Sequence, residues 1–111
     1  MVVLLDKPAT EAQLKTLRSQ SVAEIRLAVD AELELVAAGG EYHKDCEDVL
    51  LAAGSEQENV WGATWIRTLA VVEFVSVINL RPRAAKWTME LHDELLRARI
   101  ERIVRNYLGA V

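Results

Sequence analysis

The sequence predicts an α+β fold: a mainly antiparallel β-sheet with a short N-terminal helix and a longer C-terminal helix packed on it. Three observations lead to this class. From Ile25 to Leu35, apolar and polar residues alternate with a period of two, as in a strand with one wet face. From Val71 to Leu80 the chain is rich in β-branched residues. Between Leu96 and Leu108, apolar residues recur at helical spacing.

The N-terminal segment predicts a strand followed by a helix. The apolar run from Val2 to Leu5 is most simply a short strand. Thr10 is a good N-cap, and Gln13 three residues later completes a capping box, so a helix should run from there to Gln20. Its apolar residues form a narrow stripe, which predicts packing on a sheet face.

The period of two between Ile25 and Leu35 predicts extended structure with the odd-numbered residues buried and the even-numbered ones exposed. The strand is either bent or folded into a hairpin, and Gly39-Gly40 ends it. Its many Ala, Glu and Leu residues favour a helix instead. We give the periodicity more weight, because a period of two cannot place these side chains on one helix face.

The next segment predicts a loop or single helical turn from Glu41 to Glu47 and a short buried strand from Val49 to Leu51. A turn at Gly54-Ser55 would reverse this strand. The return run passes Trp61 and reaches Gly62, which suggests a bulge or a close approach of two backbones.

The last two elements are predicted to be a central strand and the C-terminal helix. Val71 to Leu80 is apolar on both faces, so the strand should be covered on both sides, and Pro82 must end its pairing. Asp93 is a suitable N-cap for the helix, and Gly109 should stop it.

Composition predicts one globular domain over residues 1–111, with 51% hydrophobic and 27% charged residues. The net charge of −4 argues against binding to nucleic acid or an anionic membrane, and no membrane span or signal peptide is expected. Cys46 is the only cysteine, which excludes an intrachain disulfide and suits a reducing cytoplasm.

The chain carries three short polar motifs: H-x-D-C-E from His43 to Glu47, W-G-A from Trp61 to Ala63, and N-x-R-P from Asn79 to Pro82. In their order and separation they resemble one bacterial family of small uncharacterised proteins, a domain of unknown function. The resemblance spans roughly Ile25 to Leu108 and implies a compact domain but no reaction. The chain departs from the family pattern at Ala84-Ala85-Lys86, where a Gly-Asn type of loop would be expected.

The first candidate site is the cluster of His43, Asp45, Cys46 and Glu47. His43 with Asp45 or Glu47 can serve as acid and base in a small hydrolytic enzyme. His43 and Glu47 are too few ligands for a metal, so neither a metal nor a cofactor is predicted. The flanking carboxylates should raise the pKa of Cys46, which favours a structural cysteine over a nucleophile. The alternative for the whole cluster is a capped turn.

The second candidate site is Asn79, Arg81 and Arg83, at or just past the end of the predicted central strand. A guanidinium beside an amide suits a carboxylate or phosphate, which predicts a pocket for a small anionic ligand near Asn79 and Arg81. The alternative is that Arg81 pairs internally with an acidic residue and fixes the loop around Pro82.

The three tryptophans, Trp61, Trp65 and Trp87, predict a homodimer or larger homo-oligomer in which at least one of them contacts another subunit; core packing is the alternative. The leading functional hypothesis is a small cytoplasmic binding or assembly protein. Its expected binding residues are Trp61, Asn79, Arg81 and Arg83. The alternative hypothesis is the hydrolytic enzyme, which would gain support if His43 and Arg81 lined one pocket.

Overall fold

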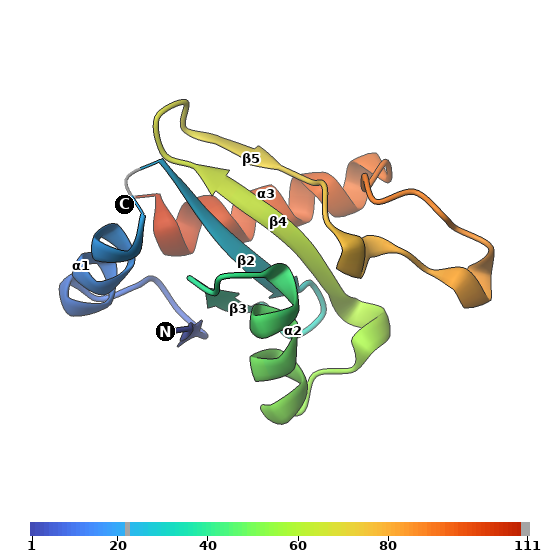
Figure 1. Ribbon diagram of the computed structural model, residues 1–111, viewed down its shortest axis with the longest axis horizontal. Coiled ribbons are helices and arrows are strands. Elements are labelled where there is room, and N and C mark those ends of the chain that lie inside the picture. The colour runs from blue at the N-terminus through green and yellow to red at the C-terminus, as the bar shows by residue number, and fades with distance from the viewer. Residues whose placement is uncertain (22, 110–111) are drawn as a thin grey trace.

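The computed structural model describes residues 1–21 and 23–109, and it confirms the α+β class (Figure 1). Five strands form one antiparallel sheet in the order β1-β3-β2-β4-β5. The strands are β1 (Val3–Leu5), β2 (Glu24–Asp30), β3 (Leu35–Ala38), β4 (Val60–Ile66) and β5 (Val71–Glu73). The helices are α1 (Glu11–Gln20), α2 (His43–Ala52) and α3 (Glu94–Leu108), with short 3-10 turns η1 (Gln57–Asn59), η2 (Val77–Asn79) and η3 (Pro82–Ala84).

The sheet lies between two layers. Figure 1 shows α2 in front of the sheet and α3 behind it. The larger core lies on the α3 side, where Leu27, Ile100 and Leu108 are fully buried, and Leu17 of α1 joins it. The smaller core lies on the α2 side and includes Cys46 and Leu50. Both faces of the central strands are therefore covered.

The N-terminal elements follow the sequence patterns closely. Thr10 caps α1, and its backbone N–H donates to Gln13 Oε1 (2.8 Å) while Gln13 N–H donates to Thr10 Oγ1 (3.2 Å), so the predicted capping box is confirmed. The helix ends at Gln20 as expected. The apolar side chains that it buries are Leu14 and Leu17.

The segment from Ile25 to Leu35 is extended and folds into the β2–β3 hairpin, one of the two predicted forms. Ile25, Leu27 and Val29 are buried as predicted. The prediction is wrong for Leu33, which is 58% exposed because it lies in the turn. The expectation of a wet face is also wrong for Asp30, which is buried because the even-numbered face of the sheet is covered as well, with Ala28 in the smaller core.

The predicted strand at Val49–Leu51 is wrong, because these residues belong to α2. Of the loop or single helical turn predicted from Glu41 to Glu47, the helical alternative holds from His43 onward, but the helix continues to Ala52, and Glu41 and Tyr42 precede it. The Tyr42 N–H donates to Asp45 Oδ2 (3.0 Å) and so caps the helix. Cys46 and Leu50, four residues apart, pack on the sheet. A short apolar run does not distinguish a strand from a buried helical turn, which explains the error.

The predicted central strand at Val71–Leu80 is also wrong. β5 has three residues, lies at the edge of the sheet, and shows Val71 41% exposed. Beyond a bridge between Val75 and Glu90, the chain projects from the body and returns (Figure 1). We call this projection, residues 77–89, the arm; η2, η3 and a bridge between Arg81 and Lys86 shape it.

The last helix agrees with its prediction. Asp93 Oδ1 accepts a hydrogen bond from the Leu96 N–H (3.0 Å), and Gly109 is the C-cap. α3 buries Ile100, Ile103, Val104, Tyr107 and Leu108. Across the described ranges, no helix combines the length and apolar character needed to cross a membrane.

Candidate functional site

Several of the predicted site residues meet along β4. β2 pairs with β4 from Val60 to Ile66, whereas β5 pairs only with Thr64 to Ile66. The outer edge of the first half of β4 thus has no neighbouring strand. Buried backbone N–H and C=O groups need partners, so other groups must supply them here.

Asn79 supplies the partner of Gly62. Its Oδ1 accepts from the Gly62 N–H (2.7 Å), and its Nδ2 donates to the Gly62 carbonyl (3.1 Å). The same Nδ2 lies 3.2 Å from the carbonyl oxygens of Phe74 and Met89, on either side of the base of the arm. The residue is 3% exposed. Its amide therefore holds the arm against β4. Both the oxygen and the nitrogen that a ligand would need already have hydrogen-bond partners within the chain.

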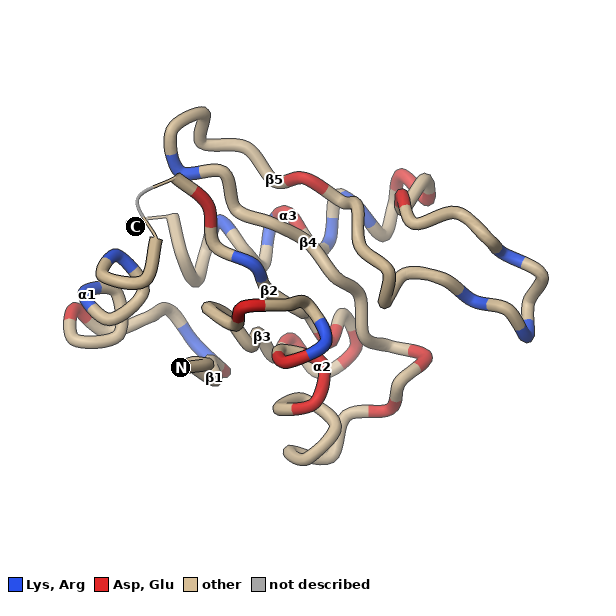
Figure 2. Tube along the Cα trace, viewed as in Figure 1, with Lys and Arg blue, Asp and Glu red and all other residues tan. Residues whose placement is uncertain are grey.

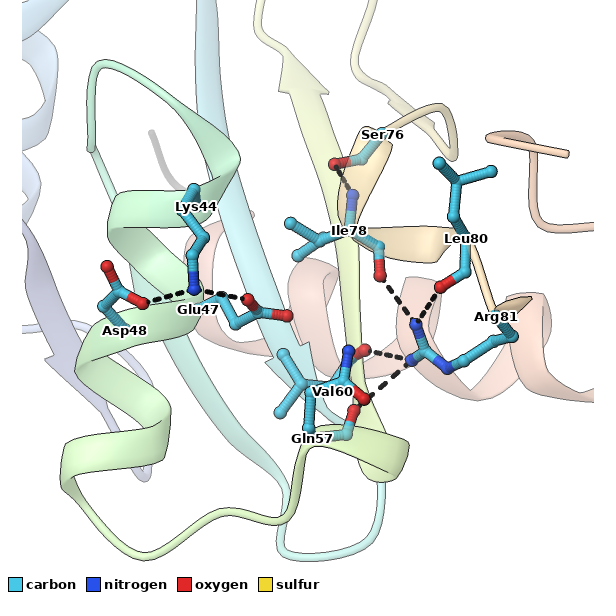
Figure 3. A network of polar contacts seen from close by, with 9 residues as sticks. All are labelled: Lys44, Glu47, Asp48, Gln57, Val60, Ser76, Ile78, Leu80 and Arg81. Carbon is cyan, nitrogen blue, oxygen red and sulfur yellow. Dashed lines mark hydrogen bonds and ion pairs between the residues drawn. The ribbon is translucent and has the colours of Figure 1, made fainter. Parts of the chain in front are cut away.

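Arg81 fastens the arm at a second point (Figure 3). Its guanidinium donates to four backbone carbonyls and stacks on the Trp61 ring, 3.9 Å from the centroid. The acceptors are Ile78 (2.6 Å) and Leu80 (3.1 Å) for Nη1, and Val60 (2.6 Å) and Gln57 (3.4 Å) for Nη2. The partners of Arg81 are thus mainly backbone carbonyls rather than the carboxylates that the structural alternative assumed.

Gly62 completes the attachment because it admits the arm. A Cβ at this position would lie 2.5 Å from both Cβ and Oγ of Ser76 and 2.8 Å from Cγ1 of Ile78. The close backbone approach predicted for Gly62 is confirmed. We call Gly62, Asn79 and Arg81 the latch. Two of the resemblance motifs, W-G-A and N-x-R-P, therefore contact each other through the latch.

Replacing Arg81 with lysine should lower the melting temperature by several degrees. An ammonium cannot donate to carbonyls on both sides and stack on Trp61 at once. We expect a loss of about 1–2 kcal/mol, at about 4 °C per kcal/mol for a domain of this size. Differential scanning calorimetry measures this, and Arg83→Lys, at an exposed position on the arm, is the matched control. An unchanged melting temperature combined with weakened sulfate binding would support the anion site instead.

His43, the first residue of α2, also contacts β4. Its Nε2 lies 3.0 Å from the carbonyl oxygen of Ala63 and 3.0 Å from Thr64 Oγ1. A carbonyl oxygen only accepts, so Nε2 carries the proton and cannot take one from the hydroxyl. Asp45 caps the helix through the Tyr42 N–H. His43 and Asp45 thus face different partners, and no acid–base pair is seen between them.

Cys46 and Glu47 lie on the buried face of α2. Burial raises the pKa of the Cys46 thiol, with Asp45 adding to the effect, and its Sγ faces the Arg26 carbonyl oxygen at 3.6 Å. Glu47 is 5% exposed; its Oε1 accepts from Lys44 Nζ (3.1 Å), while its buried Oε2 has no hydrogen-bond partner among residues 1–21 and 23–109. Within the part of the chain that the structure describes, no three His, Cys, Asp or Glu side chains gather as metal ligands would.

His43 should make stability depend on pH. Burial lowers its pKa below the usual value, with Arg26 acting in the same direction. Protonation therefore costs more in the folded than in the unfolded protein, so stability falls as the pH drops from about 6.5 through the lowered pKa. We expect His43→Gln to reduce the loss of melting temperature between about pH 7.5 and about pH 5. His92→Gln, at an exposed position, should keep the full loss; equal losses in both variants would contradict the prediction.

A hollow of about 840 Å³ lies beside the latch, between η1 and the arm. Its lining residues are Glu56, Gln57, Glu58, Leu80, Arg81, Pro82, Arg83 and Ala84. Neither His43 nor Asn79 belongs to the lining, so His43 and Arg81 do not share this pocket. An anion here would meet Arg81 and the exposed Arg83, opposite Glu56 and Glu58, whose mutual hydrogen bond and repulsion raise the pKa of Glu56. The anion site stays a prediction.

The three tryptophans differ in exposure. Trp65 is 3% exposed in the larger core, and Trp61 is half-buried beneath Arg81. Trp87 is 70% exposed on the arm. The sequence named Trp87 only as one of three candidate subunit contacts and not as a ligand-binding residue, although its place in a cationic segment without acidic residues was a usable signal. Of the three, Trp87 is the side chain most accessible to another molecule.

Comparison with known proteins gives a family match. The family model described as Protein of unknown function (DUF5674) matches residues 3–107. No curated protein and no solved structure matches the chain. The predicted resemblance to a family of unknown function is confirmed, over a longer stretch than the motifs indicated.

Proposed function

We propose that this chain, which belongs to the DUF5674 family, is a small cytoplasmic binding or assembly protein whose arm is its partner-binding element. The observation that carries the proposal is Trp87, 70% exposed on a projection that the latch holds in place. Tryptophan is enriched at the energetic centres of protein interfaces. An arm that is already ordered loses little entropy on binding.

The surroundings of Trp87 support a protein partner. Met89 is 48% exposed and Val77 is 60% exposed on the same arm. The hollow beside Arg83 suits a carboxylate of that partner. The expected anionic ligand would then be a carboxylate group of the partner protein. The single cysteine, buried and unpaired, supports a reducing compartment. The arrangement around His43 offers no comparable support for a hydrolytic enzyme.

Site-specific photo-crosslinking tests the proposal. A photoreactive phenylalanine replaces Trp87 in the full chain, and the matched control carries it at Leu69, which is also 70% exposed but lies in the β4–β5 loop. We expect one defined protein adduct from position 87 and none from position 69, because only the arm faces the partner. No adduct at position 87, or the same adducts at both positions, would overturn the proposal.

A further inference from the structure

The arm and α2 carry opposite charge. The arm contains Arg81, Arg83 and Lys86 and no acidic residue, so it contributes +3 to a chain whose net charge is −4. Residues 41–58, which we call the acidic surface, hold six acidic residues against Lys44, a net charge of −5. One of the six, Glu47, is buried, and the other five are exposed. Figure 2 shows the blue positions at the far end of the arm and red positions along α2 and the segment after it.

Most of these charges have no ion-pair partner among the described residues; the exceptions are Glu47 and Asp48, which pair with Lys44. Among the described residues, no ion pair within 4.0 Å involves Arg83 or Lys86. No ion pair within 4.0 Å between described residues involves Glu56 or Glu58 either. Both surfaces therefore keep net charge for an external partner, although only the hollow separates them.

The acidic surface also offers an apolar contact. Tyr42, at the start of α2, is 65% exposed, and Trp87 on the arm is 70% exposed. Aromatic residues of this kind supply much of the contact area in interfaces whose rim is charged. Each surface thus presents an exposed aromatic residue beside charge of one sign.

We propose that the partner of the arm is a second copy of this chain, with the arm of each copy lying against the acidic surface of the other. This rests on the proposed function. In a twofold dimer the same surface is used by both copies. The cationic arm of each copy then faces the acidic surface of the other, so both contacts of the dimer join opposite charges. The complementary charges favour this contact over one between two arms.

A nucleic acid is the weaker candidate. With +3 on the arm, the rest of the chain carries −7 and would repel a phosphate backbone. The acidic surface would also have no role in such a complex. A second copy accounts for both surfaces.

A charge exchange between two variants tests the proposal. The arm variant combines Arg83→Glu with Lys86→Glu, and the surface variant combines Glu56→Lys with Glu58→Lys. Each variant alone brings like charges together at both contacts of a dimer, so its dimer should be at least about tenfold weaker. A mixture of the two restores both contacts and should form a mixed dimer. Lys7→Glu with Lys15→Glu, at exposed positions on the N-terminal segment, matches the charge change of the arm variant.

Sedimentation equilibrium gives the outcome, with circular dichroism confirming that each variant is folded. We expect the wild type to sediment at twice the 12.4 kDa chain mass and its dimer to weaken as the salt concentration rises. The control variant should dimerise as strongly as the wild type. A monomeric wild type, or a dimer that the arm variant leaves intact, overturns the second copy as partner. If position 87 still gives an adduct with a different protein, the proposed function stands and only this inference fails. Salt-sensitive retention of the wild type on a single-stranded oligonucleotide, lost in the arm variant without any self-association, would also overturn it.

Discussion

Asn79→Ala should be among the most destabilising single substitutions in this chain. It removes the acceptor of the Gly62 N–H and the donor to the carbonyls of Gly62, Phe74 and Met89. A buried polar group left without a partner costs about 1–3 kcal/mol, and at least two such groups remain. We expect a loss of about 3–5 kcal/mol, which chemical denaturation with urea measures.

The matched control is Asn106→Ala, at an exposed position on α3, which should change stability by less than about 0.5 kcal/mol. Asn79→Asp distinguishes the role of the amide oxygen from that of the amide nitrogen. It keeps the acceptor for Gly62 but loses the three donated contacts, so it should also be strongly destabilising. If Asn79→Ala were as stable as the control, the latch would not hold the arm.

Gly62→Ala should produce the second large effect. The new methyl group would lie 2.5 Å from Ser76 Cβ and Oγ, and both positions belong to closely packed backbone segments. Overpacking of this kind costs about 1–3 kcal/mol, and displacement of the arm would add to it. We expect a melting temperature lower by about 4–12 °C.

The double variant Gly62→Ala with Ser76→Gly identifies the cause. Removing the Ser76 side chain takes away the two closest atoms, although it also removes the acceptor of the Ile78 N–H. A double-mutant cycle should therefore show a favourable coupling of about 1 kcal/mol or more. If the two substitutions changed the free energy of unfolding strictly additively, the clash at position 62 would be relieved by movements other than the loss of the Ser76 side chain.

The parts of the fold that the sequence predicted are those with a local physical signature. The Thr10–Gln13 capping box and the Asp93 cap depend on residues three apart, and the alternation in β2 depends on its own side chains. α2 was missed because its buried face is narrow, so that its short apolar run at Val49–Leu51 had the appearance of a strand. The Val71 segment was misread because exposed valines at an edge have the same composition as buried ones at the centre.

For the candidate site, the sequence identified Trp61, Gly62, Asn79 and Arg81 but not their relation. Their partners are backbone groups, such as the Val60 carbonyl and the Gly62 N–H. Every residue has a backbone carbonyl, and nearly every residue has a backbone N–H, so residue types do not show which of these groups a side chain will bind. Predicting the latch would have required knowing that β5 stops short of the first half of β4, a property of the assembled sheet.

The unpaired outer edge of β4 has a further consequence, for aggregation. An open strand edge is a template on which a strand from another chain can add. In the folded protein, Asn79 and Arg81 occupy the hydrogen-bonding groups of Gly62 and Val60, so this template is closed. If the arm detached while the sheet stayed intact, β4 would present both its backbone and its apolar neighbours to other chains. Partial opening of the arm, rather than global unfolding, is then the route by which this protein would form β-rich aggregates.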